Sequence, residues 1–288
     1  MACAPPFERV AVLGTGLVGG SFALALRRAY PQTRVIGWDF ARVAQRAVDR
    51  GAVHEAAGSL AEAVEGADLV YLALPVGATL DLLPTIAAYP DRRWLVTDAC
   101  STKTSICHAA VKSFRAPARF LGGHPLAGKE LSGIENADPD LFREAKYALI
   151  ANAEDPDERL AKFASLVRGF GAEVAWCDAE THDWAVGIVS HLPQLTSIAL
   201  ARVVLDELDE TGLPVSLAGS GLRDLLRLAG SPYSVWRDIC FTNTENISRS
   251  LDRLSQAIDQ LRNLLRSREL EDEFHSANEL YKILHNLQ

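Results

Sequence analysis

One histidine stands where a proton acceptor would be useful. His124 lies in the string Gly122-Gly-His-Pro-Leu-Ala-Gly128, directly after the strand-like apolar run Arg119–Gly123. A histidine titrates near neutral pH and is a natural general base. A lone histidine is more often structural, but the glycines and the proline around this one indicate a shaped loop. We therefore expect His124 to be catalytic.

A serine is placed to work with this histidine. Ser101 follows the strand-like run Trp94–Ala99, and its hydroxyl could bond either a substrate hydroxyl or the imidazole of His124. Alternatively it caps the helix expected over Thr104–Ser113, and the two roles are compatible. Lys103, beside the first turn of that helix, is expected at the surface.

Two arginines offer a site for an anion. Arg223 and Arg227 are four residues apart, which on a helix places both guanidinium groups on one face. Because arginine binds carboxylates in a bidentate way, the pair suits a dianionic substrate. The alternative is a solvated face with ion pairs to Asp224 and Glu130.

Two further histidines and a tryptophan are candidates for the same cleft. His182 and His191 are nine residues apart, so on an undistorted helix they point to opposite faces. One of them is expected to face the cleft, and we favour His191. Trp236 could wall a pocket against a ring or pack into the core.

A glycine-rich turn predicts a nucleotide site. The pattern G-x-G-x-x-G stands between an apolar strand and a helix, a context typical of dinucleotide binding. Its first glycine allows a tight turn, its second a close approach of a pyrophosphate, and its third close packing of helix on strand. Free N–H groups at the helix start attract phosphates. The alternative is a turn without a ligand. The expected contact residues are Gly14, Gly16, Leu17, Val18 and Gly19.

An acidic residue then indicates which dinucleotide is bound. Asp39 ends the second strand, about twenty residues after the third glycine, where a carboxylate accepts both ribose hydroxyls of NAD. The same charge would repel the extra phosphate of NADP, although Arg42 and Arg46 soften that preference. The sequence predicts NAD over NADP. Asp39 could also cap the following helix.

The elements that position these residues alternate between two periods. Seven short apolar runs read as buried strands, and helical stretches separate them, which is typical of a parallel sheet covered on both faces. Leu74 and Pro75 end the third strand, where backbone contact with the cofactor is expected. The strand runs are Arg9–Gly14, Arg34–Asp39, Asp68–Pro75, Trp94–Ala99, Arg119–Gly123, Tyr147–Asn152 and Glu173–Cys177.

After Cys177 the pattern becomes helical, without a convincing strand. A long stretch from Ala179 to Leu208 should kink at Pro193, because proline removes a backbone hydrogen bond. Breaks and helices then follow at Gly219–Gly221, from Tyr233 to about Ser267, and over Leu270–Leu287.

These patterns predict two domains. Residues 1–178 read as a Rossmann-type, doubly wound and mainly parallel α/β domain, and residues 179–288 as an all-α domain for substrate binding and dimerisation. Part of the apolar helical surface is expected to pack against a second subunit. The alternative is that all of it closes over its own core.

Composition excludes several classes. A net charge of −8 argues against nonspecific nucleic-acid binding. Five widely spaced cysteines without C-x-x-C indicate neither a disulfide framework nor a metal site. The first residues do not resemble a signal peptide, and no uninterrupted apolar run approaches the ~20 residues of a membrane span. A cytoplasmic protein is expected, with neither membrane nor metal.

Taken together, four segments resemble the prephenate/arogenate dehydrogenase family over nearly the whole chain. The strings with chemistry are Asp98-Ala-Cys-Ser-Thr-Lys103, Gly122-Gly-His-Pro-Leu-Ala-Gly-Lys-Glu-Leu-Ser-Gly133, Ser190-His-Leu-Pro193 and Gly219-Ser-Gly-Leu-Arg-Asp-Leu-Leu-Arg227, the last followed by Trp236.

The resemblance implies a role for each matching residue. His124 would take the proton of a ring 4-hydroxyl with help from Ser101, and Arg227 would hold a substrate carboxylate. Contacts to the substrate side chain are implied for His191 and Trp236, and an ion pair at the pocket mouth for Glu130 and Arg223. The chain departs from many relatives at Lys129, where they carry Thr, and at Gln194, where some carry His.

The implied reaction is NAD-dependent oxidative decarboxylation of prephenate to 4-hydroxyphenylpyruvate, in tyrosine biosynthesis. Arogenate, with an amino group in place of the keto group, is the alternative substrate. Lys129 favours prephenate, because it adds positive charge and no extra carboxylate is evident for an ammonium. A β-hydroxyacid dehydrogenase is a weaker alternative, since the stretch 179–209 lacks the lysine such enzymes use. A nucleotide-binding protein without chemistry is the other.

Overall fold

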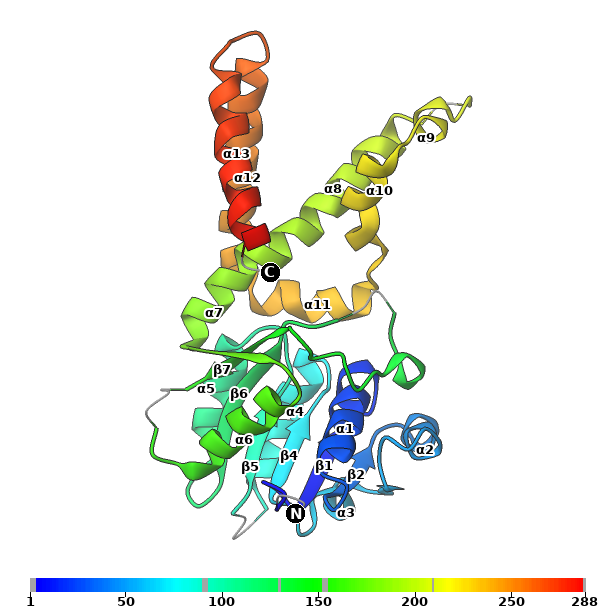
Figure 1. Cartoon of the computed structure of the whole chain (residues 1–288), viewed down its shortest axis with the longest axis vertical. Coiled ribbons are helices and arrows are strands. Elements are labelled where there is room, and N and C mark those ends of the chain that lie inside the picture. Colours follow the sequence, from blue (N-terminus) through cyan, green and yellow to red (C-terminus); the bar gives the residue numbers. More distant parts are fainter. Residues whose placement is uncertain (1–3, 90–92, 129–130, 152–154, 209, 287–288) are drawn as a thin grey trace.

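The structure is a computed structural model that describes residues 4–89, 93–128, 131–151, 155–208 and 210–286. A sheet unit covered by helices occupies one end of the molecule, and the C-terminal helices project from it as two arms (Figure 1). Helices α12 and α13 form one arm, and α8, α9 and α10 form the other, while α11 lies across the top of the sheet unit. In the C-terminal half, α7 and α11 contact the sheet unit.

One eight-stranded sheet forms the centre of the first unit, in the order β3-β2-β1-β4-β5-β6-β7-β8. This confirms the predicted mainly parallel, doubly wound α/β fold and all seven predicted strands, and adds a two-residue strand, β3. The strands are β1 Arg9–Leu13, β2 Arg34–Trp38, β3 Glu55–Ala56, β4 Leu69–Leu72, β5 Leu95–Asp98, β6 Arg119–Pro125, β7 Lys146–Ile150 and β8 Glu173–Cys177.

One strand pair departs from the parallel pattern. Strands β6 and β7 are antiparallel, with His124 opposite Ala148, so β7 and β8 run against the other six strands. A parallel crossover needs a connection that spans the length of the sheet, usually a helix. In the described part of the β6–β7 connection the only helical element is one 3₁₀ turn, η1 (Ile134–Asn136). Strand β7 therefore returns beside β6 in the opposite direction.

Helices cover both faces of the sheet, as predicted. On one face the ring of Phe22 stacks on Tyr71 with centroids 3.8 Å apart, and Phe163 packs against both. On the other face Trp94, Leu83 and other apolar side chains form a second core. The covering helices are α1 Leu17–Ala29, α2 Ala41–Asp49, α3 Leu60–Val64, α4 Val76–Ala87, α5 Thr104–Ser113 and α6 Glu158–Gly169.

The C-terminal half is helical throughout its described residues. Helix α7 (Ala179–Val186) continues through a π turn, η2 (Gly187–His191), into α8 (Leu192–Asp206). The predicted distortion near Pro193 thus takes the form of a π turn just before it, which is a common device at functional sites. The remaining helices are α9 Leu213–Ser216, α10 Ser220–Leu226, η3 Arg227–Gly230, α11 Tyr233–Thr242, α12 Thr244–Leu264 and α13 Leu270–Asn286.

The segment expected to be continuous from Tyr233 to about Ser267 is broken at Asn243. This residue leaves the helical conformation (φ −128°, ψ 27°) between α11 and α12. Its buried side-chain amide donates a hydrogen bond to the carbonyl of Asp183 at 2.8 Å. A tertiary contact therefore sets the break, which is why the periodicity of the sequence did not reveal it.

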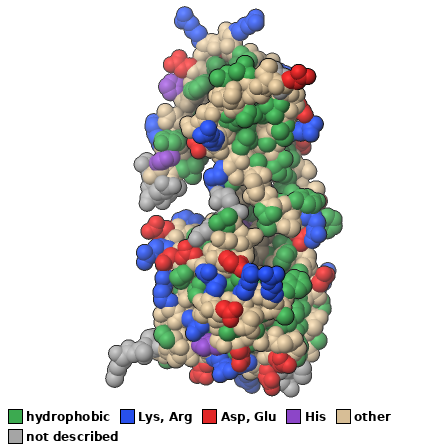
Figure 2. All heavy atoms as spheres, turned by 90° about the vertical axis from the view of Figure 1, so that its right-hand side faces the viewer, with side chains coloured by type: hydrophobic (Ala, Val, Ile, Leu, Met, Phe, Trp, Pro, Cys, Tyr) green, Lys and Arg blue, Asp and Glu red, His purple; other side chains and the backbone are tan. Residues whose placement is uncertain are grey.

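The helical half exposes much apolar surface. The continuous helix Ala179–Asp206 is long and apolar enough, by length and composition alone, to cross a bilayer. Its first turns, however, bury His182 and Asp183 against the sheet unit, and such groups are costly in lipid. Figure 2 shows hydrophobic side chains gathered over this half. More than half exposed are Val203, Leu205, Leu213, Leu217, Leu225, Phe241, Leu265, Phe274, Leu280 and Leu284.

Candidate active site

The glycine loop has the geometry of a dinucleotide cradle. Gly14 adopts φ +90°, and a Cβ there would lie 2.3 Å from the carbonyl oxygen of Ala73. A Cβ on Gly19 would lie 1.8 Å from the carbonyl oxygen of Gly14, so α1 packs against the turn only because both are glycines. A Cβ on Gly16 would meet nothing within 4 Å. The second glycine therefore borders open space at the start of α1, where a pyrophosphate fits.

Helix α1 begins at Leu17, followed by Val18. Its N-cap residue, Gly16, has no side chain that could cap the first turn. The first amides of a helix have no partner within the helix and carry the positive end of its dipole. The cradle therefore combines an open surface with N–H donors and suits the phosphates of a nucleotide.

Asp39 lies beside this loop. Its Oδ2 accepts a hydrogen bond from the amide of Thr15 at 2.7 Å, and its Oδ1 accepts one from the amide of Phe40. The carboxylate is half-buried and thus keeps a face toward solvent. Helix α2 begins two residues later, at Ala41, with Phe40 as its N-cap residue, so Asp39 does not take the alternative role of N-cap. The residues of the loop and Asp39 fit the dinucleotide that the sequence predicts.

A cavity of about 470 Å³ opens between the carboxyl edge of the sheet and the helical half. It brings together five residues singled out from the sequence, which are Ser101, His124, Arg227, Trp236 and Val18. Val18 belongs to the nucleotide loop, so the cavity borders the predicted cofactor site. The other lining residues are Ala99, Pro125, Leu126, Ala127, Gly128, Val189, Ser190, Gln194, Leu228 and Ser231.

Two glycines place His124 at this edge. A Cβ on Gly123 would lie 2.5 Å from the carbonyl oxygen of Asp98, and one on Gly122 would lie 2.9 Å from Cys107 Sγ. Because neither residue has a side chain, β6 can lie close to the end of β5 and to helix α5. His124 then follows as the next residue of the same strand and is nine-tenths buried.

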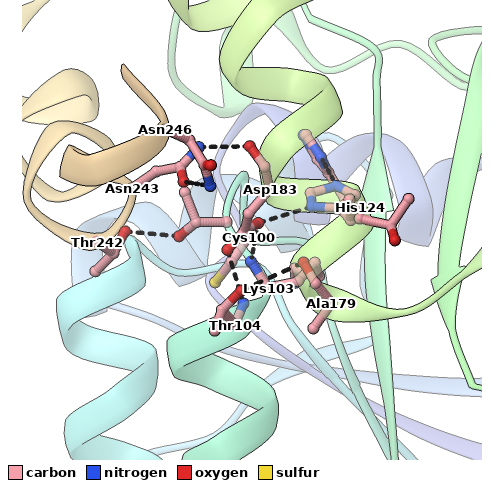
Figure 3. A network of polar contacts seen from close by, with 12 residues as sticks. Cys100, Lys103, Thr104, His124, Ala179, Asp183, Thr242, Asn243 and Asn246 are labelled. Atoms are coloured by element: carbon pink, nitrogen blue, oxygen red, sulfur yellow. Dashed lines mark hydrogen bonds and ion pairs between the residues drawn. The ribbon is translucent and has the colours of Figure 1, made fainter. Parts of the chain in front are cut away.

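The imidazole of His124 belongs to a buried polar network (Figure 3). Its Nδ1 lies 2.9 Å from Nε2 of His182, and Nδ1 of His182 lies 2.8 Å from Oδ1 of Asp183. Both partners come from α7, so the helical half contributes directly to the surroundings of the expected base. No sequence pattern indicates this contact, because His191 and not His182 is expected to face the cleft.

Burial and charge keep this histidine neutral. Burial, followed by the positive charges that His182, Lys103 and His191 can carry, lowers the pKa of His124 well below its ordinary value. A neutral imidazole has an unprotonated nitrogen and can accept a proton. For Asp183, burial raises the pKa, but hydrogen bonds from His182 and from the Thr104 and Lys103 amides outweigh it and lower the pKa overall.

Lys103 is not at the surface, and that expectation is wrong. Its side chain is fully buried, where Nζ forms an ion pair with Asp98 and donates to the carbonyl of Gly123 at 2.7 Å. Helix α5 begins at Thr104 as predicted, and its N-cap residue is Lys103 and not Ser101. The amides of Lys103 and Thr104 donate to Asp183, so Ser101 is left to line the cavity.

His191 has a different position from the one expected. Its ring is 1% exposed, lies 3.1 Å from the Asn243 amide nitrogen through Nδ1, and meets the ring of Trp236 edge to face at 5.7 Å. Burial lowers the pKa of His191 to about 4. Its neighbours Ser190 and Gln194 line the cavity instead, and the Gln194 amide donates to the carbonyl of Leu228 at 2.9 Å.

The two arginines separate. Arg227 lines the cavity, whereas Arg223, on α10, is exposed and lies outside the lining set. Lys129 and Glu130, which were expected at the pocket mouth, lie outside the described residues.

A smaller cavity of about 170 Å³ lies next to the first and shares Ser101. Leu74 and Pro75 line it, as does Ile239 of α11. Beside it the carboxylate of Asp238 accepts a hydrogen bond from the amide of Gly77 at 2.9 Å, so α11 supplies a cap to the first turn of α4. Asp238 lies two residues after Trp236, and no sequence pattern indicates this capping role.

The arrangement can do one kind of chemistry well. A neutral imidazole and a hydroxyl face a cavity that also holds a guanidinium group, beside a nucleotide cradle. Such a site can bind an anion and accept a proton while a bound nucleotide takes up a hydride. Among the described residues, no group of three or more His, Cys, Asp or Glu side chains is placed to hold a metal ion.

Two family models match the chain. Residues 22–176 match the family described as "Prephenate dehydrogenase, nucleotide-binding domain", and residues 178–283 match "Prephenate dehydrogenase, dimerization domain". The prephenate dehydrogenase of Lactococcus lactis subsp. cremoris is 32% identical over 256 residues, which cover 88% of this chain and 70% of the relative.

Solved structures agree with these matches. A prephenate dehydrogenase from A. aeolicus, crystallised with hydroxyphenyl propionate and NAD+, has a TM-score of 0.86 at 29% identity and covers 96% of this chain and 97% of its own. An arogenate dehydrogenase from Synechocystis has a TM-score of 0.81 at 30% identity and covers 96% and 99%. The relatives thus include enzymes named for either substrate.

Proposed function

The chain belongs to the prephenate dehydrogenase family, and from this membership we propose that it converts prephenate to 4-hydroxyphenylpyruvate with NAD as oxidant. The observation that carries the proposal is the single cavity that holds His124, Ser101 and Arg227 beside the glycine loop. Proton acceptor, hydrogen-bonding hydroxyl and carboxylate partner therefore surround one substrate-sized space.

Each functional residue of the cavity has a separate role in the proposed reaction. Arg227 binds a carboxylate of the substrate, and Trp236 forms a wall for its ring. His124 accepts the proton of the ring hydroxyl, and Ser101 bonds that hydroxyl or the imidazole. The ring carbon that bears the hydroxyl gives up a hydride, the ring carboxylate leaves as CO₂, and the ring becomes aromatic. The phenol oxygen of the product then takes back the proton from His124.

A nicotinamide nucleotide supplies the hydride acceptor when it is bound. Gly14, Gly16 and Gly19 would hold its pyrophosphate against the start of α1, and Asp39 would accept its ribose hydroxyls. The protein contributes orientation, because the glycine loop and the cavity meet at Val18.

Prephenate is the proposed substrate in preference to arogenate. Arogenate carries an ammonium group, and a site for it would be expected to offer a carboxylate. Among the described residues that line the cavity there is no Asp or Glu, whereas Arg227 adds a positive charge. The keto acid therefore suits this lining better than the amino acid does.

We further propose a cytoplasmic homodimer with a domain boundary at residues 178/179. Support comes from the apolar residues exposed on α8, α9, α12 and α13, a larger surface than a monomer usually leaves to water. The matching C-terminal family model is described as a dimerization domain. Light scattering coupled to size-exclusion chromatography tests the homodimer, because two chains of 31.3 kDa should give twice that molar mass.

A direct assay tests the activity. Purified protein is mixed with prephenate and NAD, and NADH formation is followed by absorbance, with arogenate and with a β-hydroxy acid in parallel. The expected result is turnover of prephenate that is at least ten times more efficient than that of either alternative. The His124→Asn variant should keep nucleotide binding, measured by calorimetry, and lose most of kcat. Near-normal turnover by this variant would remove His124 from its role.

A further inference from the structure

The expected base is the end of a chain of three side chains. The Nδ1 atom of His124 meets Nε2 of His182, and Nδ1 of His182 meets Oδ1 of Asp183, at 2.9 and 2.8 Å. We propose that Asp183 and His182 are positioning residues that keep neutral His124 protonated on Nδ1, so that Nε2 is its basic nitrogen. This inference rests on the proposed function, in which His124 accepts the substrate proton.

The proton positions in this network follow from Asp183, because a carboxylate has no proton to donate. An ionised carboxylate only accepts hydrogen bonds, so Nδ1 of His182 must donate to Asp183. In the proposed scheme His182 carries a single proton, the one on Nδ1, so its Nε2 accepts. The contact from His124 is therefore a donation by its Nδ1–H, which leaves the lone pair of the same ring on Nε2.

Asp183 is held in the state that this scheme needs. Its Oδ1 accepts from the amide of Lys103 at 2.7 Å, and its Oδ2 accepts from the amide of Thr104 at 2.8 Å. These amides open α5, where the helix dipole stabilises a negative charge. The side chain is almost completely buried, so its position is fixed as well as its charge. Figure 3 shows Asp183 between the start of α5 and His124.

The other charges around His124 act in one direction. Lys103 before α5 disfavours an imidazolium at His124, although Asp98 pairs with Lys103, and His182 on α7 and His191 on η2 would do the same if they were protonated. Asp183 is the anion of the network that reaches His124 through a hydrogen-bonded partner. When Nε2 takes up the substrate proton, the new positive charge is stabilised along the chain toward Asp183. The same three residues therefore keep His124 neutral before the reaction and stabilise its positive charge after the proton transfer.

Paired variants of His182 provide the kinetic test. Glutamine at this position still offers an oxygen that can accept from Nδ1–H of His124, whereas leucine offers none. We expect His182→Leu to lower kcat by on the order of 10²–10³-fold with KM for prephenate within threefold of wild type, and His182→Gln to recover at least tenfold of that loss. His108→Leu, at an exposed histidine of α5, is the matched control and should leave kcat unchanged.

Asp183→Asn tests the other end. Asparagine removes the negative charge that holds the proton of His182 on Nδ1, so that proton can move to Nε2 and His124 can take the opposite tautomer. For a comparable change in a serine-protease triad the loss in kcat is about 10⁴-fold, and a loss on the order of 10³–10⁴-fold is expected here. The acid limb of the pH profile of kcat/KM should also shift, which loss of packing alone would not cause.

Nuclear magnetic resonance of ring nitrogens reads the tautomer without any turnover. In nucleotide-free wild-type protein with ¹⁵N-labelled histidine, the His124 ring, assigned by its loss in His124→Asn, should show protonated Nδ1 and unprotonated Nε2. Protonated Nε2 in wild type, or unchanged kcat in His182→Leu, overturns the proposal. An inactive wild type with the expected tautomer would contradict the proposed function and leave the positioning chain intact.

Discussion

Lys103 and Asp98 form an ion pair in which neither side chain is exposed to solvent. The remaining acceptor capacity of Asp98 is used by the amides of Cys100 and Gly123, and Lys103 also donates to the carbonyl of Gly123. The pair therefore connects the end of β5 to β6 directly beneath His124. A buried charge with its partner removed is costly, because no water replaces the lost contact.

This pair predicts a large effect on stability. Lys103→Met removes the charge from an unbranched side chain that is only one atom shorter, and it leaves the Asp98 carboxylate uncompensated. We therefore expect the free energy of unfolding to fall by about 3–5 kcal/mol. The double variant Asp98→Asn/Lys103→Met leaves no unpaired charge and should recover at least half of that loss. Urea denaturation of the three proteins measures both values. Equal stability of the single variant and wild type would contradict the buried pair.

The low pKa of His124 predicts the pH dependence of activity. The base works only while it is neutral, and its pKa is held well below the ordinary value by burial and by neighbouring positive charges. In a plot of kcat/KM against pH, the loss of activity caused by protonation of His124 should therefore lie below about pH 6.5, the ordinary pKa of histidine. Activity is kept as pH falls through that value and is lost only when pH reaches the depressed pKa. An acid limb at or above the ordinary value, in initial rates across the pH range, would contradict this environment.

Asp39 predicts cofactor choice. Its carboxylate lies at the end of β2, where it accepts from Thr15 and keeps a face free for ribose hydroxyls. Hydrogen bonds to a charged group contribute about 1.5–3 kcal/mol, so Asp39→Ser should lower kcat/KM for NAD by roughly 10–100-fold. The same change removes the repulsion of the extra phosphate and should raise kcat/KM for NADP. Wild type that prefers NADP would defeat the assignment.

Arg227 predicts a binding defect. It is the charged residue on the described cavity wall, apart from the titratable His124, and is assigned to a substrate carboxylate. Arg227→Ala should raise KM for prephenate by about 10–100-fold with a smaller change in kcat, as expected for a lost charge-assisted hydrogen bond. Arg227→Lys keeps the charge without the bidentate geometry and should fall between the two. Steady-state kinetics decide, and an unchanged KM in the alanine variant would refute the contact.

Local sequence patterns predicted what depends on local physics. The strand runs, the glycine loop and the start of most helices could be found because periodicity and glycine chemistry act within a few residues. Gly14 illustrates this, since its positive φ and tight contact with Ala73 follow from a recognisable motif. The reversed direction of β7 was missed, because it depends on a connection whose described part contains no crossover helix.

The site was predicted less completely, for a geometric reason. His124, Ser101, Arg227 and Trp236 line one cavity, but His182 was expected to face away because regular helix geometry was assumed between it and His191. The π turn η2 lies between them and changes their angular relation. Lys103 was expected at the surface because charged residues usually lie there. Its side chain is buried because Nζ pairs with Asp98 and donates to the carbonyl of Gly123, which is distant in the sequence.

The contacts of Asp183 limit how the protein could be recombined. A cut after Asp178 separates the glycine loop and His124 from the aspartate that caps α5 and orients His182. A chimera that joined this N-terminal half to helices from a different dehydrogenase would inherit its nucleotide cradle but not the alignment of its histidine. Any engineered exchange therefore has to transplant the His182–Asp183 turn along with the sheet.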